Sequence, residues 1–193
     1  MLFRSELTPS AAEQARALGL CVLEQTIDDH AAKHSASHDV VCAFQVLEHI
    51  AEPGRFISSC LDVLRPGGRL ILSIPSADSF AGDLPNHALD LPPHHITRWS
   101  DRCLSELKSI FPVSIEAIWS EPLRPIHYRL ALQSRFYRTL WQLRGREVLP
   151  VDRSSIGRLT LWLGWKLSKI FAFVESLFPR RGISVTVVLR KLA

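Results

Sequence analysis

Cysteine is scarce in this chain, and its spacing is unsuited to metal binding or cross-linking. The 193 residues include four cysteines, none of them in a CxxC pair, which argues against a zinc ribbon and against a disulfide-stapled secreted domain. Three of the four have apolar neighbours, so we expect buried free thiols. The first ten residues also lack the apolar core of a signal peptide, which favours a cytoplasmic protein.

Acidic residues are scarce in the last third of the chain. Of the 23 Lys and Arg residues, 14 lie between Arg124 and Lys191, together with only three of the 19 acidic residues. The charge asymmetry and the helical pattern between Pro122 and Gly182 predict a core over residues 1–122, a basic, aromatic-rich helical insertion over 123–181 and a final core strand over 182–193. No nucleic-acid-binding module is recognisable, so we expect no nucleic-acid partner.

The apolar residues alternate between strand-like runs and helical spacing. Strands are predicted over residues 21–25, 39–44, 69–75, 113–120 and 183–191, and helices over 8–20, 52–64, 100–111, 126–146 and 154–178. Residues 39–44 form a near-continuous apolar run, typical of a buried parallel strand, and 26–38 are predicted to be a polar connection. The alternation predicts a doubly wound α/β sheet, in which ligands bind at the carboxyl ends of the strands.

Several short motifs, in order and suitably spaced, resemble one enzyme family. They are Asp39-Val40-Val41, Val46-Leu47-Glu48-His49, Arg65-Pro66-Gly67-Gly68, Ile74-Pro75 and "LPPHHITRWS" at 91–100. Together they resemble class I S-adenosylmethionine-dependent methyltransferases, in particular the bacterial branch that includes the ubiquinone-biosynthesis O-methyltransferases. The resemblance implies a Rossmann-like sheet, S-adenosylmethionine as cofactor, and methyl transfer to a small-molecule or lipid-linked acceptor.

One part of that family pattern is absent from the sequence. The family begins with a strand that ends in a glycine-rich loop, where any side chain would block the approach of the backbone to the cofactor. Residues 1–5 already resemble the family's second strand, and no later segment replaces the loop. We therefore expect a sheet without its first strand. The chain is then either a fragment of a methyltransferase or a degenerate, non-catalytic relative.

The resemblance assigns residues at the strand ends to the cofactor: Glu6, Leu7, Gln25, Thr26, Ile27, Phe44 and Gln45. Glu6 resembles the carboxylate that accepts hydrogen bonds from both ribose hydroxyls, while Asp28 or Asp29 could receive the adenine amine. Phe44 is either a cation–π partner of the sulfonium or an ordinary core residue.

Three histidines are candidates for a general base, namely His94, His95 and His49, because imidazole titrates near neutral pH. In the ubiquinone branch a Glu-x-x-Glu-His pattern is associated with a divalent metal. Here Gln45 replaces its first acid, and Mg²⁺ prefers carboxylates, so no metal site is predicted. Glu48 could instead cap the helix that follows.

The last predicted helix, in residues 156–178, has two chemically distinct sides. At about 100° per residue, Arg158, Lys166 and Lys169 gather on one side, flanked by Trp162 and Trp165. The opposite arc is broad and apolar: Leu163, Leu167, Ile170, Phe171, Val174, Leu177 and Phe178. Such a helix suits either a lid packed on the sheet or a partner subunit, or a membrane surface. A peripheral membrane module is therefore an alternative function.

Overall fold

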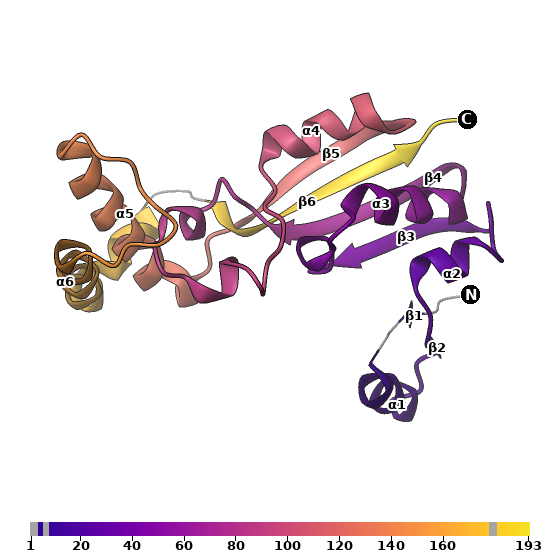
Figure 1. Cartoon of the computed structure of the whole chain (residues 1–193), viewed down its shortest axis with the longest axis horizontal. Helices are drawn as coiled ribbons and strands as arrows, with labels where there is room; N and C mark the ends of the chain where they lie inside the picture. The colour runs from indigo at the N-terminus through magenta and orange to yellow at the C-terminus, as the bar shows by residue number, and fades with distance from the viewer. Residues whose placement is uncertain (1–3, 6–7, 178–180) are drawn as a thin grey trace.

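The computed structural model describes residues 4–5, 8–177 and 181–193, and its strands form two separate sheets (Figure 1). Strand β1 (Arg4–Ser5) pairs in parallel with β2 (Val22–Leu23). The larger sheet has the order β3-β4-β6-β5. Its strands are β3 (His38–Phe44), β4 (Leu64–Pro75), β5 (Val113–Pro122) and β6 (Arg181–Lys191). The predicted strands are all present.

The larger sheet mixes parallel and antiparallel pairing. Strand β3 runs parallel to β4, with Val41 opposite Leu70, and the Arg65–Gly68 segment forms a bulge in β4. Strand β6 runs antiparallel to both β4 and β5 and lies between them. The last strand of the chain is therefore an interior strand of the sheet.

Local signals mark the starts of several helices. The helices are α1 (Pro9–Ala17), α2 (Ile27–Ala31), α3 (Pro53–Val63), α4 (Asp101–Ile110), α5 (Tyr128–Leu143) and α6 (Ser155–Phe171). The described residues also form short 3₁₀ helices, which are η1 (Leu47–His49), η2 (Phe80–Asp83), η3 (Ala88–Asp90), η4 (Pro125–His127) and η5 (Ala172–Leu177). The starting signal is a side-chain cap for α2 and α4, and a proline in the first turn for α1 and α3. Helix α4 shows the capping directly, because the Ser100 side chain accepts a hydrogen bond from the Cys103 amide at 3.2 Å.

Helix α2 corrects the prediction of a featureless polar connection over 26–38. The Thr26 hydroxyl accepts from the Asp29 amide at 3.0 Å, and the Asp29 carboxylate accepts from the Thr26 amide at 3.2 Å. This reciprocal pair is a capping box. Hydrogen bonds from Thr26 also hold the pKa of Asp29 below its ordinary value. The Thr-x-x-Asp spacing was visible in the sequence.

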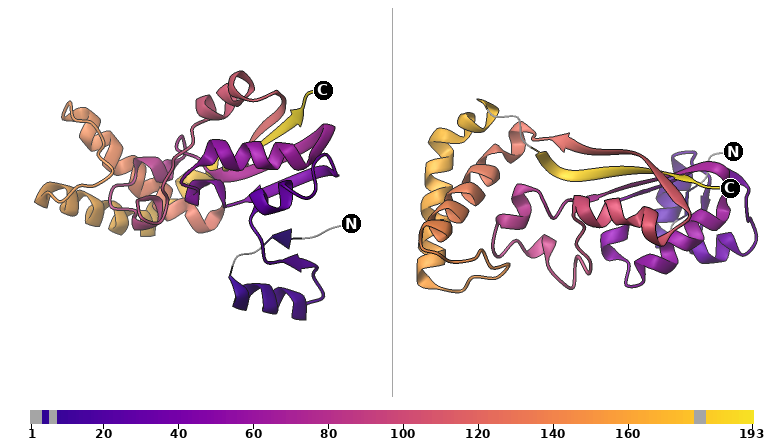
Figure 2. Two further views of the ribbon diagram at one scale, coloured as in Figure 1. Left: turned by 45° about the vertical axis from the view of Figure 1, so that its right-hand side comes forward. Right: turned by 90° about the horizontal axis from the view of Figure 1, so that it is seen from above.

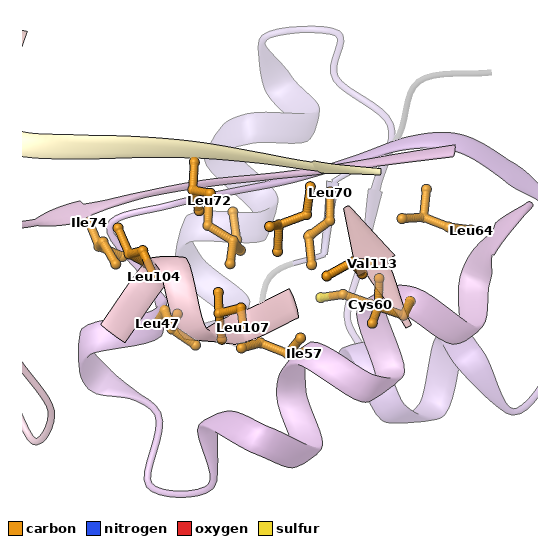
Figure 3. Close-up of a cluster of buried hydrophobic side chains, with 14 of the residues drawn as sticks. Leu47, Ile57, Cys60, Leu64, Leu70, Leu72, Ile74, Leu104, Leu107 and Val113 are labelled. Carbon is orange, nitrogen blue, oxygen red and sulfur yellow. The ribbon is translucent and has the colours of Figure 1, made fainter. Parts of the chain in front are cut away.

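Helices α3 and α4 cover one face of the larger sheet and form the main core with it (Figure 3). Leu70, Leu72 and Ile74 of β4 are fully buried there. They pack with further buried side chains from the helices, η1 and β6: Leu47, Ile57, Cys60, Leu104, Leu107, Val185, Val187 and Leu189. Alternate residues of β4 and β6 thus point to the same covered face.

Strand β3 is an exposed edge, so the prediction that it is buried was wrong. Only Ala43 in it is buried, while Val40 is 48% exposed and Phe44 is 60% exposed. The physical reason is that β3 pairs with β4 alone, and no described residue forms a strand on its other side. This free edge, between the two sheets, is where the family resemblance predicts the first strand.

The cysteines are free thiols, as predicted, but their burial was mostly predicted wrongly. Cys60 is buried, whereas Cys21, Cys42 and Cys103 are exposed. Burial, and secondarily the Asp28 carboxylate, raise the pKa of Cys60 to about 12. Its thiol therefore stays neutral and packs as an apolar group.

Helices α5 and α6 form a hairpin that lies between β5 and β6 in the chain. Figure 2 shows this hairpin at one end of an elongated molecule. Asp152 anchors the connecting loop, because the buried Tyr137 hydroxyl donates to its carboxylate and the Ser154 amide donates at 2.8 Å. Within the described ranges, no helix is long and apolar enough to span a bilayer.

Candidate active site

A cavity of about 610 Å³ lies beside the carboxyl ends of β2 and β3. Its walls come from the β2–α2 turn, from the segment around η1 and from α3. The lining residues are Gln25, Thr26, Ile27, Asp28, Val46, Ile50, Ala51, Glu52, Arg55 and Phe56. The three residues predicted to contact adenine, Gln25, Thr26 and Ile27, therefore line one cavity together.

The polar side of the cavity is held by contacts between α2 and α3. The Asp28 carboxylate accepts from the Ser59 hydroxyl at 2.5 Å and pairs with the Arg55 guanidinium at 2.9 Å. Asp29 is engaged in the capping box of α2. Of the two acids proposed for the adenine amine, Asp28 is therefore the one at the cavity.

The cavity suits the adenosine end of S-adenosylmethionine. Val46, Ile50 and Phe56 supply an apolar wall for a flat ring, and Gln25 and Asp28 supply polar atoms at its rim. The methionine end of the cofactor has no matching binding loop here, since no glycine-rich turn borders this cavity among the described residues. The residues present fit one half of the cofactor.

Glu48 is buried beside this cavity with an unpartnered carboxylate. The residue is 2% exposed, and neither carboxylate oxygen has a hydrogen-bond partner in the described part of the chain. An isolated buried carboxylate costs several kcal/mol. The Glu48 side chain therefore does not cap α3, and the His49 imidazole is the basic group within ion-pair distance of it.

Two histidines lie close to Glu48, since a ring nitrogen of His49 and one of His95 lie within 4.8 Å of a Glu48 carboxylate oxygen. His49 Nε2 lies 3.9 Å from Glu48 Oε1, and the His49 Nδ1 donates to the main-chain oxygen of His94 at 2.6 Å. His95 Nδ1 lies 3.3 Å from the Asp90 carboxylate, which in turn pairs with Arg98 at 3.1 Å. The His94 carbonyl and the Asp90 carboxylate are both acceptors, so Nδ1 is the donor in each of these two contacts.

The loop that carries His94 and His95 is fastened to η1 by main-chain bonds. The Ile96 and Thr97 amides both donate to the Glu48 carbonyl, at 2.8 and 3.1 Å. The Thr97 hydroxyl donates to the Leu47 carbonyl at 3.2 Å. These bonds place the loop at the carboxyl end of β3, next to the residues that line the cavity.

The structure distinguishes the three candidate histidines. The ring of His94 is exposed and stacks on His95 at 5.2 Å between centroids, whereas the side-chain ligand atoms of Glu48, His49 and His95 all lie within 4.8 Å of one another. His94 contributes its main-chain oxygen, through which it orients His49. Sequence reasoning missed Asp90, since no local pattern relates it to His95.

The Glu48, His49 and His95 group could also hold a divalent transition metal. Two imidazoles and one carboxylate form a common ligand set for such ions, and a carbonyl or carboxylate on Nδ1 is the usual support for a metal-binding histidine. Gln45 is not part of the group. The sequence-based prediction of no metal site stays a prediction.

Of the other predicted cofactor residues, Phe44 and Gln45 do not line the cavity. Glu6 and Leu7 are outside the described residues. Phe44 and Gln45 are exposed at the end of β3, where the Gln45 amide donates to the Ser73 carbonyl at 2.8 Å and φ of Gln45 is +55°. The alternative of Phe44 as a core residue was wrong, because its side chain is 60% exposed.

A second cavity, of about 310 Å³, lies between the loop after β4 and α5. Its lining is strongly charged and includes Asp78, Asp83, Arg135, Arg138 and Arg181. Arg138 pairs with Asp83 at 2.8 Å, and Arg181 pairs with Asp101. A lining rich in paired charged side chains is poorly suited to a flat aromatic ring, so this cavity is a weaker candidate for adenine binding.

Comparison with known proteins agrees with these observations. A family model described as a methyltransferase domain matches residues 9–111, more than half of the chain. The ubiquinone biosynthesis O-methyltransferase of Cronobacter sakazakii is 35% identical over 51 residues, which are 26% of this chain and 21% of that protein. The match thus spans about a fifth of the length of the curated relative.

Solved structures share the fold at low sequence identity. A methyltransferase described as S-adenosylmethionine-dependent from Archaeoglobus fulgidus has a TM-score of 0.55 and 11% identity, covering 97% of this chain and 74% of that chain. One from Mesorhizobium loti has a TM-score of 0.55 and 14% identity, covering 97% and 78%. The sheet and its helices are therefore a Rossmann-like α/β fold. The chain belongs to the methyltransferase-domain family, and S-adenosylmethionine is the cofactor that this membership implies.

Proposed function

We propose that this chain provides most of an active site that methylates a small-molecule or lipid-linked acceptor. The observation that carries the proposal is the buried Glu48 carboxylate with a ring nitrogen of His49 and one of His95 within 4.8 Å of it. This group borders a cavity that suits adenosine. The relative named for ubiquinone biosynthesis acts, by its name, on an oxygen, and a hydroxyl acceptor is the kind of substrate a histidine base would serve.

The roles of the residues follow from their contacts. Gln25 and Asp28 would bind the adenine edge, and Val46, Ile50 and Phe56 would exclude water from the ring. Asp90 and the His94 carbonyl would orient the two imidazoles by accepting hydrogen bonds from Nδ1, so that Nε2 would be the atom that accepts a proton. S-adenosylmethionine, when bound, supplies an electrophilic methyl group. His95 or His49 would remove the acceptor proton, and Glu48 would stabilise the resulting imidazolium.

A methyl-transfer assay tests this function directly. The chain, extended upstream of Met1 by a strand and glycine-rich loop, is incubated with S-adenosylmethionine labelled in its methyl group. The acceptors offered are catechols, prenylated phenols and a total lipid extract. We expect label in a hydroxyl-bearing acceptor, lost when Glu48, His49 and His95 are replaced together. Cofactor binding without any label transfer would favour the non-catalytic alternative, a methyltransferase-like domain with a binding role only.

A further inference from the structure

Helix α6 packs with its small side chains inward and its large apolar side chains outward. The buried positions are Gly157, Thr160, Gly164 and Ser168. The exposed apolar positions, with exposures from 37% to 68%, are Ile156, Leu159, Trp162, Leu163, Trp165, Leu167, Ile170 and Phe171. A helix that faces water normally shows the reverse pattern. Packing within the chain therefore does not explain the large side chains of α6.

The inner face of α6 is fixed by close contact with α5 and with the loop between them. A Cβ atom added to Gly164 would lie 3.2 Å from Phe136 Cδ1, and one added to Gly157 would lie 2.2 Å from the Asp152 carboxylate. The Gln133 side chain also donates to the Leu161 carbonyl at 2.9 Å. Because these contacts require small residues, α6 cannot rotate to bury its apolar side chains on α5.

The exposed surface of α6 combines two adjacent arcs. At 100° per residue, Arg158, Lys166 and Lys169 fall within an arc of about 80°, and the three are exposed. Leu159, Leu163, Ile170, Ile156 and Leu167 occupy the neighbouring arc. The helix contains no acidic residue.

Tryptophans lie along the basic arc. Lys166 Nζ lies 5.5 Å from the centre of the Trp162 ring, and the Arg129 guanidinium covers Trp165 at 3.8 Å. Tryptophan beside lysine and arginine is the composition of helices at a bilayer surface, where the indole occupies the headgroup level. The basic arc has the charge that complements an anionic surface.

The position of the helix allows it to meet a flat surface. Figures 1 and 2 place α6 at the outer end of the molecule, with the carboxyl ends of β3 and β4 directed toward the hairpin. Ser134 of α5 joins the hairpin to the loop after β4 by donating to the Phe80 carbonyl at 2.7 Å. A surface bound to α6 would therefore lie at the same end of the molecule as the active-site loops.

We propose that α6 docks this protein on an anionic membrane, lying in the plane of the interface. Leu159, Leu163 and Ile170 enter the acyl region, and Arg158, Lys166 and Lys169 contact lipid phosphates and carboxylates. Docking of this kind needs no cofactor, so it stands independently of the methyl-transfer proposal.

The test is co-sedimentation of the 193-residue protein with two kinds of vesicle, phosphatidylcholine alone and phosphatidylcholine with phosphatidylserine. Binding should be stronger to the anionic vesicles and should weaken as salt is raised. Lys166→Glu with Lys169→Glu should lower the partition coefficient at least about tenfold. Leu163→Gln with Ile170→Gln should lower it on both kinds of vesicle.

The matched control is Lys33→Glu with Lys108→Glu, which makes the same change in net charge at two exposed positions far from α6 in the chain. This variant should bind vesicles like the unchanged protein. Equal losses in the control and the α6 variants would overturn the proposal in favour of general electrostatic attraction. Absence of vesicle binding, with a dimer in sedimentation velocity that Leu163→Gln with Ile170→Gln dissociates, would overturn it in favour of a second copy on this face.

Tryptophan fluorescence measures whether α6 inserts into the bilayer. Lipids brominated in their acyl chains should quench the unchanged protein, and Trp162→Phe should remove a large part of that quenching, because Trp162 is the tryptophan of α6 that lies nearer to the inserted arc. Unchanged quenching in Trp162→Phe would show that another surface enters the lipid and would contradict the assignment.

Discussion

Replacing His95 by Gln is expected to lower methyl-transfer turnover by about 10²–10⁴-fold, the range that a positioned acid–base group contributes. Glutamine keeps the polarity and approximate size of the ring but cannot accept a proton at a neutral nitrogen base. His95 is the strongest candidate because it is mostly buried, with Asp90 on Nδ1 and the Glu48 carboxylate within 4.8 Å of a ring nitrogen. Affinity for S-adenosylhomocysteine should not change, because His95 does not line the cavity.

His94→Gln is the matched control for this prediction. It changes the adjacent ring, which is exposed, and leaves intact the main-chain oxygen that orients His49. Turnover should stay close to that of the unchanged enzyme. A loss in His94→Gln as large as that in His95→Gln would assign the effect to the loop as a whole, and full turnover in His95→Gln would place the base elsewhere.

The second large effect concerns cofactor affinity. We expect the 193-residue chain to bind S-adenosylhomocysteine weakly, and a form extended upstream by a strand and glycine-rich loop to bind about 100-fold more tightly. The cavity beside Gln25 and Asp28 can bind adenosine, whereas the free edge of β3 leaves the methionine end without main-chain donors. Two or three added hydrogen bonds, at about 1 kcal/mol each, account for that difference.

Isothermal titration calorimetry on the two forms measures this difference. The exposures of Val40 and Phe44 on β3 predict that the extension also stabilises the fold, because an added strand would cover both side chains. The melting temperature should therefore rise in the extended form without ligand. Micromolar binding by the 193 residues alone would contradict the prediction, since it would show that the glycine-rich loop is not needed.

Local signals explain why most elements could be predicted from the sequence. Ser100 before α4 and the Pro53-Gly54 start of α3 belong to the helix itself, so their effect needs no distant contact. The signal for helix α2, the Thr26–Asp29 capping box, is equally local, but it was not recognised in the sequence. The burial of β3 could not be predicted, because it depends on which strand lies beside it and not on its own apolar residues.

The active site depended on contacts between segments far apart in the chain. His49 and His95 were each recognised as base candidates, but their meeting at Glu48 requires the loop after β4 to bond to η1. Likewise, the periodicity of α6 defined its basic and apolar arcs but did not show which side packs on α5. Gly157 and Gly164 carried that information, because only small residues permit such a close approach.

The most direct measurement for the central claim is hydrogen–deuterium exchange of the extended form with and without S-adenosylhomocysteine. The account predicts slower exchange in residues 25–28 and 46–56, the segments that line the larger cavity. Residues 131–138, which border the charged second cavity, should exchange at the same rate in both states. Protection confined to residues 78–83 and 131–138, with none at 25–28, would contradict the placement of the cofactor.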